Sequence, residues 1–399
     1  MGQHQSCTVY KSRTWRRVAG ALEGLTVLDL SSHLSGPYCA MLLADHGADV
    51  IKIERPGRGD EARAMPPFVE GESAPFMVWN RNKRSVTLDL KSDDGRRALL
   101  GLVRSADILV ENFRPGTLDR LGLGWSALSA LNPRLIYGAI SGFGQSGPWR
   151  DRGGFDLVTQ GMSGLMSVCG PADGPPHRLP IALSDVAAGM HLAVGILAAL
   201  EARHRTGQGQ YVEVSLLDAA ISFGVYEAAH VFATGEKPPR IGQAHRGSSP
   251  YQVFGTADGW ITVGAAQQNF WEALCRILDA PELRNDPRFR ANRDRVAHNA
   301  ELVELLQERF REYPSQHWLD AFDLAGIPAG QVLDFAEALA HPQVVAREMV
   351  VEAEHATAGR VRTLGIPAKL SATPGSVRRA APALGEHTHA VLDSLGEVA

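Results

Sequence analysis

Leu25-Thr-Val-Leu-Asp-Leu30 has the apolar, partly β-branched composition of a buried strand. It is followed by a short helical pattern, Gly36-Pro-Tyr-Cys-Ala-Met-Leu-Leu-Ala-Asp45, and by a second strand pattern, Ala48-Asp-Val-Ile-Lys-Ile53. A strand, a helix and a strand in this order form a βαβ unit, whose two strands lie parallel and are joined by a right-handed crossover. The stretch therefore predicts a parallel sheet.

The same alternation continues further along the chain. Strand patterns occupy residues 85–90, 107–111 and 135–140, and a helical pattern occupies residues 93–105. Strands separated by helical segments of about 10 to 15 residues are typical of a sheet wound like a nucleotide-binding fold. We therefore expect an α/β protein whose large domain is Rossmann-like.

The pattern changes after Leu200. A helix is predicted over 216–234, and a Gly/Pro-rich break follows it. Residues 251–254 and 260–263 then resemble the two strands of a β-hairpin, and helices are expected from 269 to about 324. These elements predict a second, smaller α+β domain.

Domain limits follow from these patterns. We place the small α+β domain at 226–328, and we assign residues 21–225 together with 329–399 to the large domain. Residues 1–20 contain lysine and arginine but no acidic residue, and we expect them to be a flexible extension. The expected location is the cytoplasm, or the mitochondrial matrix if residues 1–20 are a presequence.

Composition excludes several classes of function. The 399 residues carry a net charge of −4, so no extended basic surface for nucleic acid is expected. The 14 histidines and four cysteines lack metal-ligand spacing, and we expect no metal site and no disulfide framework. The longest apolar run, 191–200, is shorter than a membrane span and predicts a buried helix.

One glycine motif invites a different interpretation. Gly142-Phe-Gly-Gln-Ser-Gly147 matches the dinucleotide fingerprint and follows a predicted strand. That fingerprint requires its third glycine to open a long helix, whereas Pro148 and the pair Gly153-Gly154 follow here and would interrupt one. We therefore expect a loop, and no nicotinamide or flavin cofactor.

Asp185 is the most informative acid of the chain. It stands in Ile181-Ala-Leu-Ser-Asp-Val-Ala-Ala-Gly-Met-His191, where small apolar residues surround it. An acid in such a setting is unusual unless it is hydrogen-bonded, paired or used in catalysis. An acid directly before an apolar helical run is also an ordinary helix N-cap, so the local pattern leaves both interpretations open.

About ten motifs along residues 22–395 resemble those of one family. They are, in order, Leu22-Glu-Gly-Leu-Thr-Val-Leu-Asp29, Gly36-Pro37, Gly47-Ala-Asp-Val-Ile-Lys-Ile-Glu-Arg-Pro56, Asn80-Arg-Asn-Lys-Arg84, Leu88-Asp-Leu-Lys91, Glu111-Asn-Phe-Arg-Pro-Gly116, Gly142 to Pro148, Ala182-Leu-Ser-Asp185, Thr206-Gly-Gln-Gly-Gln210 and Gly326-Ile-Pro328. Together they resemble the class III coenzyme A transferases, which include the formyl-CoA:oxalate, carnitine and succinyl-CoA:dicarboxylate CoA-transferases.

The resemblance implies a chemical role for Asp185. In that family the aspartate of the matching segment is the nucleophile, and it carries coenzyme A as an aspartyl thioester. A carboxylate with an ordinary pKa of about 3.9 is ionised at neutral pH and needs no helper base. The resemblance also implies that the loop around Gly247 and Ser248 covers the site, and we expect its backbone N–H groups to stabilise the tetrahedral states, although the consecutive glycines of the formyl-CoA enzyme are absent here.

Contacts to coenzyme A are implied by the same resemblance. The implied residues are Leu34, Ser35, Arg55, Leu88, Lys91, Asn112, Phe113, Arg114, Arg120, Gly153 and Gly154. The basic residues would face the phosphates, and the others the adenine and the pantetheine arm. Taken singly, each Arg or Lys is equally consistent with a solvated surface charge.

Two alternative functions share the expected fold. α-Methylacyl-CoA racemases need a histidine before the aspartate of the loop that matches 153–156, but this chain has Phe155-Asp156 there, and a phenyl ring cannot transfer a proton. Asp156 would then orient the intermediate or cap the loop. A non-catalytic CoA-binding subunit is the other alternative, and the presence of Asp185 argues against it.

The resemblance also bears on substrate and assembly. Residues 153–166 resemble the branch that acts on succinyl-CoA and dicarboxylic acids more than the oxalate branch. We therefore expect small-molecule partners only, an acyl-CoA donor and a carboxylic acid acceptor. The family assembles as interlocked homodimers, and we expect the same here.

Overall fold

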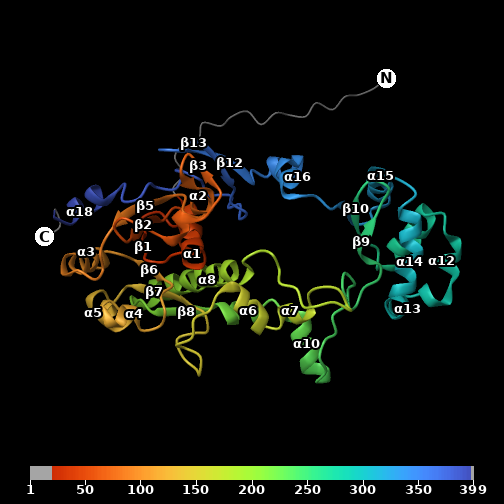
Figure 1. The fold of residues 1–399 in the computed structure, drawn as a ribbon, viewed down its shortest axis with the longest axis horizontal. Coiled ribbons are helices and arrows are strands. Elements are labelled where there is room, and N and C mark those ends of the chain that lie inside the picture. Colours follow the sequence, from red (N-terminus) through yellow and green to blue (C-terminus); the bar gives the residue numbers. More distant parts are fainter. Residues whose placement is uncertain (1–19, 397–399) are drawn as a thin grey trace. The chain divides into compact units, whose positions relative to one another are not determined.

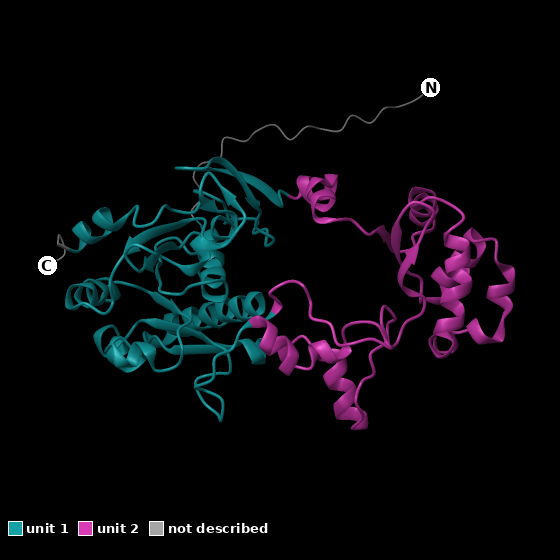
Figure 2. Cartoon of the chain, viewed as in Figure 1, with its two compact units in different colours: residues 1–155, 184–219, 348–399 teal, residues 156–183, 220–347 magenta. Residues whose placement is uncertain are grey.

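The computed structural model describes residues 20–396 (Figure 1). The extension expected at residues 1–20 lies outside them, apart from Gly20. Two compact units are present (Figure 2): residues up to Phe155, Ser184–Ala219 and the chain from Glu348 onward form the first, and Asp156–Leu183 with Ala220–Arg347 form the second. The domain limits inferred from the sequence differ from this grouping at residues 156–183, 220–225 and 329–347, and they stay a prediction.

The first unit is built on a six-stranded parallel sheet. Its strands are β1 (Thr26–Asp29), β2 (Asp49–Glu54), β5 (Lys83–Thr87), β6 (Ile108–Glu111), β7 (Ile136–Ser141) and β8 (Tyr211–Ser215). Their order is β5-β2-β1-β6-β7-β8, and all neighbouring pairs are parallel. This is the order of dinucleotide-binding folds, which changes direction between β1 and β6. The prediction of an α/β, Rossmann-like sheet is confirmed.

Helices cover both faces of this sheet. Val27, Val50 and Val110 belong to a core shared with α1 (Ser35–Asp45) and α8 (Leu183–Thr206). Leu28 and Ile51, the next residues along the same strands, pack with α3 (Asp93–Val103), α5 (Trp125–Leu131) and α18 (Thr388–Gly396). Successive side chains of a strand point to opposite faces, so a sheet covered on both sides needs the nearly continuous apolar strands seen here.

Shorter elements complete the first unit. They are η1 (Glu61–Ala64), β3 (Phe68–Val69), β4 (Glu72–Ser73), α2 (Ala74–Trp79), α4 (Thr117–Arg120), β12 (Val350–His355) and β13 (Gly359–Leu364), with the first part of α9 (Leu216–Ile221), since the unit boundary lies after Ala219. The helix predicted over 216–234 is interrupted by Gly224, and its second part is α10 (Val225–Thr234). Glycine is a poor helix former, which accounts for the break.

α8 corrects one expectation from the sequence. The apolar helix has 24 residues rather than the ten of 191–200, and its length and composition would allow it to cross a membrane. Half of its most apolar stretch of 18 residues is buried, and Leu192 and Ile196 lie in the core that covers one face of the sheet. A core helix of a globular protein can be equally long and apolar. The apolarity of α8 is therefore accounted for by its place against the sheet.

The second unit contains a three-stranded antiparallel sheet. β9 (Tyr251–Gly255) and β10 (Trp260–Gly264) form the predicted hairpin, and β11 (Ala329–Gln331) pairs with β10. The helices of the unit are α6 (Asp156–Met162), α7 (Leu165–Val168), α10, α11 (Gln268–Ile277), α12 (Pro281–Asn285), α13 (Asn292–Ala297), α14 (Asn299–Phe310), α15 (Ser315–Ala325), α16 (Phe335–Ala340) and α17 (Pro342–Ala346). Trp271 and Phe310 are fully buried in its core.

Candidate functional site

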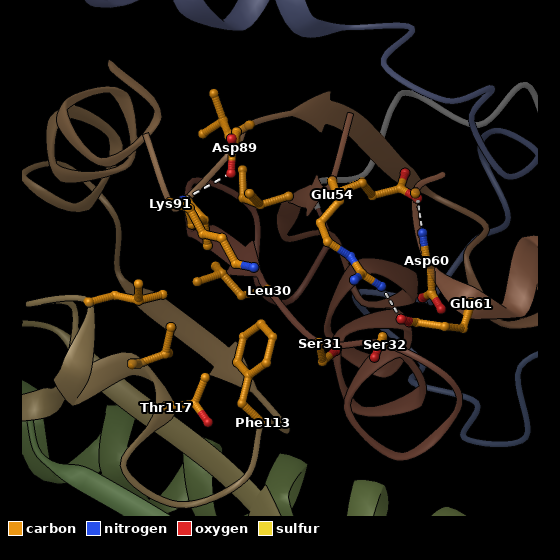
Figure 3. A pocket seen from close by; sticks show the side chains of 17 residues that line it. Leu30, Ser31, Ser32, Glu54, Asp60, Glu61, Asp89, Lys91, Phe113 and Thr117 are labelled. Carbon is orange, nitrogen blue, oxygen red and sulfur yellow. Dashed lines mark hydrogen bonds and ion pairs between the residues drawn. The ribbon is translucent and has the colours of Figure 1, made fainter. Parts of the chain in front are cut away.

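A pocket of about 330 Å³ opens at the carboxyl edge of the parallel sheet (Figure 3). Its lining comes from the segments that follow β1, β2, β5 and β6, including Ser31, Arg55, Leu88 and Phe113. Ligands of open α/β sheets bind outside the carboxyl ends of the strands, where the strand order changes direction. The pocket has this position, because β1 and β6 flank the change.

Four residues that the resemblance implied for coenzyme A line this pocket together: Arg55, Leu88, Lys91 and Phe113. The exposed Arg55 forms an ion pair with Glu61. Phe113 and Lys91 extend from opposite sides of the pocket in Figure 3. An aromatic ring and two cations in one pocket suit a ligand with a flat base and phosphates.

A buried charge network lies beside the pocket. Lys83 Nζ is 2.8 Å from Asp29 Oδ2, and Lys52 Nζ is 2.8 Å from Asp60 Oδ2 and 3.7 Å from Asp29 Oδ2. Burial lowers the pKa of Lys83 to about 8, although Asp29 opposes the shift. Burial would also lower the pKa of Lys52, but the carboxylates of Asp29 and Asp60 outweigh it and hold that pKa above its ordinary value. These pairs were not predicted from the sequence.

The network also fixes the loop after β1. Lys52 Nζ donates to the carbonyl of Ser31 at 2.9 Å, and Asp60 Oδ1 accepts from His33 N at 2.9 Å. Ser31 lines the pocket and His33 follows it in the β1–α1 loop. The buried charges therefore hold one wall of the pocket in place.

Asn112 joins the two loops on either side of the change in strand order. Its Oδ1 accepts from Ser32 N at 2.9 Å, and its Nδ2 donates to Ser32 O at 2.8 Å. Nδ2 is also 3.3 Å from the Oγ of Ser35, the first residue of α1, while Leu34 is the helix cap. The implied contacts Asn112, Leu34 and Ser35 thus meet at one place, where the amide of Asn112 is used to tie the loops.

Other implied contacts lie outside the pocket. Arg114 lines a neighbouring cavity of about 250 Å³, and Arg120 is exposed and donates to Thr117 Oγ1 at 3.1 Å. A Cβ on Gly153 would lie 3.5 Å from Arg114 Nη2. Thr117 lines both the pocket and the cavity. Arg114 is therefore near the pocket wall without lining it.

The glycine motif at 142–147 forms a loop, as predicted, and the next helix begins only at Asp156. A Cβ on Gly142 would lie 2.7 Å from the Cα of Gly154, and a Cβ on Gly154 would lie 2.8 Å from the Cα of Gly142. Such distances exclude side chains at both positions. The two glycines serve a close approach of backbone to backbone.

Asp185 is half-buried in the first turn of α8, as the third residue of the helix. The helix begins at Leu183, so the N-cap interpretation of Asp185 is wrong. One turn later, a Cβ on Gly189 would lie 2.7 Å from the carbonyl oxygen of Ser35. Residues four apart share a helix face, so Asp185 is on the face of α8 that packs against the start of α1.

The loop before α6 was expected to support the site. Asp156 is the first residue of α6, and its Oδ2 accepts from Gln160 Nε2 at 2.8 Å. Gln160 is fully buried, and its amide also bonds the backbone of Leu179 and Ile181. Phe155 is 72% exposed. Gln160 therefore connects Asp156 to the segment that leads into α8.

Gly247 and Ser248 belong to a tight loop of the second unit. Gly247 N donates to His245 Nδ1 at 3.1 Å, and Gly247 O accepts from Asn292 Nδ2 at 2.8 Å. Ser248 forms an isolated bridge with His245. The N–H of Gly247 is thus already used, which argues against it as an oxyanion donor in this conformation.

Clusters of metal-ligating side chains and free thiols bear on metal and redox chemistry. Among residues 20–396, no group of three or more His, Cys, Asp or Glu side chains could hold a metal ion. Cys39, Cys169 and Cys275 are free thiols.

Comparison with known proteins assigns the chain to a family. The sequence model of "CoA-transferase family III" matches residues 22–388. The chain belongs to CoA-transferase family III. This family III chain is 42% identical over 353 residues to acetyl-CoA:oxalate CoA-transferase of Acetobacter aceti, which covers 88% of this chain and 90% of that protein.

Two further relatives illustrate the range of the family. Human succinyl-CoA:glutarate CoA-transferase is 38% identical over 372 residues, covering 93% of this chain and 85% of that protein. The crystal structure of a CAIB/BAIF family protein from Brucella suis matches with a TM-score of 0.86 and 36% identity, covering 94% of this chain and 100% of that chain. Family III membership is therefore supported by sequence and by fold.

Proposed function

We propose that this family III enzyme moves coenzyme A from an acyl-CoA donor to a carboxylic acid, with Asp185 carrying coenzyme A between them. The observation that carries the proposal is an acid in the first turn of a 24-residue helix, in the segment Ala182–Asp185 that resembles the nucleophile motif of the family. The N-terminal end of a helix stabilises a negative charge. Asp185 can therefore be ionised and nucleophilic at neutral pH without a helper base.

The first half-reaction has two steps. A carboxylate oxygen of Asp185 attacks the thioester carbonyl of the donor, the C–S bond breaks, and a mixed anhydride and coenzyme A thiolate form. The thiolate then attacks the aspartyl carbon of the anhydride and releases the donor carboxylate, which leaves an aspartyl thioester. In the second half-reaction the acceptor carboxylate follows the same steps in reverse order, and Asp185 is regenerated.

The pocket at the carboxyl edge is the proposed site for the nucleotide part of coenzyme A. Leu88 and Phe113 would contact the base, and Lys91, Arg55 and Arg114 would face the phosphates. Arg120 and the loop at Gly153 and Gly154 would complete this surface. Both covalent intermediates react with water, so the reacting centre must exclude it.

Trapping of the intermediate tests the proposal. The protein is incubated with succinyl-CoA and then hydroxylamine, which converts an aspartyl thioester or anhydride into a hydroxamate that mass spectrometry locates. We expect the label on the peptide that contains Asp185, and a loss of transfer of at least about a thousandfold in Asp185→Ala. Asp94→Ala is the matched control, because Asp94 is an exposed acid in the first turn of α3.

Full transfer activity in Asp185→Ala, with no label from any donor, would contradict the proposal. Exchange of the α-proton of an acyl-CoA without transfer would indicate a racemase instead. Binding of coenzyme A with neither reaction would indicate a non-catalytic subunit.

We also propose a dicarboxylic or hydroxy-dicarboxylic acid as the acceptor. The support is the loop at 153–166, and relatives named for glutarate, D-citramalate and mesaconate are 37–39% identical to this chain. A relative named for oxalate is similar at 42%. Initial rates for succinyl-CoA and acetyl-CoA with glutarate, mesaconate and oxalate would decide, and a preference for oxalate would reject the proposal.

An interlocked homodimer is the proposed assembly. The chain passes between the two units four times, at 155/156, 183/184, 219/220 and 347/348. Met190, Val194 and Leu197 on α8 are 50%, 65% and 45% exposed, which suits burial against a second copy. Light scattering should give twice the chain mass, and mixing tagged with untagged folded protein should give no mixed dimers; a monomer would reject the proposal.

A further inference from the structure

Glu111 is a buried acid without an ion-pair partner among residues 20–396. It ends β6, is 6% exposed, and its Oε2 accepts from Phe113 N at 2.7 Å. Phe113 lines the proposed coenzyme A pocket. Glu111 therefore supports the turn that forms one wall of that pocket.

Glu111 also faces the cavity of about 250 Å³ that adjoins the pocket. The titratable and charged groups around it are Arg114, Asp119, Tyr137 and Tyr211. The rings of Tyr137 and Tyr211 lie 5.4 Å apart, and burial raises the pKa of both phenols, so they stay uncharged. Arg114 is the only cation among the described residues that line the cavity.

This setting disfavours the charged form of Glu111. Burial raises the pKa of Glu111 to about 8, and the negative charge of Asp119 contributes to this rise. The hydrogen bond from Phe113 N has the opposite effect, but it is weaker than the effect of burial. A buried acid of this kind is uncharged at neutral pH. Ionisation would place a carboxylate in the same cavity as Arg114, and opposite charges attract each other.

We propose that binding of coenzyme A is coupled to protonation of Glu111. The uncharged carboxyl holds the Asn112–Arg114 turn through Phe113 N and leaves the charge of Arg114 to the phosphates of coenzyme A. The ionised carboxylate competes for Arg114 and draws it into the cavity. The inference rests on the proposed function, because it takes the pocket beside Phe113 as the coenzyme A site.

Reciprocity gives the sign of the effect. If the uncharged form binds coenzyme A better, coenzyme A favours the uncharged form, and binding above pH 8 takes up a proton from solution. Below pH 7 Glu111 stays uncharged, so this group should not change the affinity for coenzyme A. Above pH 8 the Kd should rise by up to about tenfold per pH unit. Glu111 is a positioning residue in this scheme, since it acts through Arg114 and Phe113.

Calorimetry with coenzyme A at pH 8.5 tests the coupling. Titrations in two buffers of different ionisation enthalpy give the number of protons taken up. We expect up to about three quarters of a proton for the wild type and none from this group for Glu111→Gln, which keeps the uncharged shape. Glu23→Gln, at an exposed position of the same unit, should behave as the wild type.

The outcomes separate the inference from the proposed function. Binding of coenzyme A with the same proton uptake in wild type and Glu111→Gln would overturn the coupling and leave the function intact. Absence of binding in the wild type would overturn both. If Glu111→Gln fails to fold, Glu111→Asp replaces it in the calorimetry, and the wild-type Kd is measured between pH 6.5 and 9; a Kd without a rise above pH 8 rejects the coupling.

Discussion

Replacing Glu111 with glutamine should stabilise the protein, and the gain should grow with pH. The pKa of Glu111 rises from 4.5 to about 8 on folding because the carboxyl is buried. Between these values the unfolded chain has lost the proton and the folded chain retains it. Stability then falls as pH rises, by about 1.4 kcal/mol per pH unit, because ionisation favours the unfolded chain.

The size of the effect follows from this window. Over the two and a half pH units from 4.5 to 7, the wild type loses about 3 kcal/mol through this one group, and the loss levels off above pH 8. Glutamine cannot ionise, so Glu111→Gln lacks this loss. The difference in free energy of unfolding between variant and wild type should therefore increase by about 3 kcal/mol from pH 4.5 to pH 7.

The measurement must report on the unit that holds Glu111, because two compact units need not unfold together. Urea unfolding can be monitored by hydrogen exchange in peptides that cover β6 and β7, which belong to this unit. Glu23→Gln controls for loss of one surface charge. A difference between Glu111→Gln and wild type that is the same at pH 5 and pH 8 would refute the reasoning, since the carboxyl would then ionise as in solution.

Three further predictions concern the parts that hold the site. Lys83→Met should cost about 3 to 5 kcal/mol in denaturant unfolding, because it leaves the buried carboxylate of Asp29 without its nearest cation, and a cost below 1 kcal/mol would contradict this. Gly189→Ala should destabilise by about 1 to 3 kcal/mol and lower kcat, because its Cβ would meet the backbone of α1; an unchanged melting temperature would show that the helices yield without cost. Asn112→Ala removes two hydrogen bonds to Ser32 and should raise the KM for acyl-CoA more than it lowers kcat, whereas an equal change in both would point to the reaction centre.

The central strands could be predicted because they are buried on both faces. Their nearly unbroken apolar residues distinguish them from amphipathic helices, and the βαβ stretch at 25–53 predicts their parallel arrangement. β8 (Tyr211–Ser215) was not predicted. It is an edge strand with partly exposed residues, including Glu213, and a short half-exposed strand lacks that signal.

The buried charges could not be found from the sequence for a related reason. β5 was predicted at 85–90, but it begins at Lys83, whose ammonium is fully buried against Asp29. A lysine at the start of a strand usually indicates exposure, so the pattern placed the strand too late. Such burial is favourable only because Lys83 forms an ion pair with Asp29 of β1, and this contact is not visible in the local sequence.

For the candidate site, motifs and geometry contribute different information. Arg55, Leu88, Lys91 and Phe113 were implied by resemblance, and the structure places all four around one pocket. Glu111 was seen only as part of a motif. One signal was present in the sequence: Glu111 directly follows Ile108-Leu-Val110, an apolar strand buried on both faces. An acid at an exposed strand end has the same local sequence pattern, so the burial of Glu111 could not be predicted.

The division of the chain has a consequence for its synthesis. The core of the second unit lies within one continuous segment, from Phe254 to Ala329, so it can fold as soon as that segment has left the ribosome. The first unit must wait, because Val391 of α18 belongs to its core and Asn82 binds the backbone of Arg378 and Arg379. The unit that is begun first is completed last, and until the final residues emerge its parallel sheet lacks part of its cover.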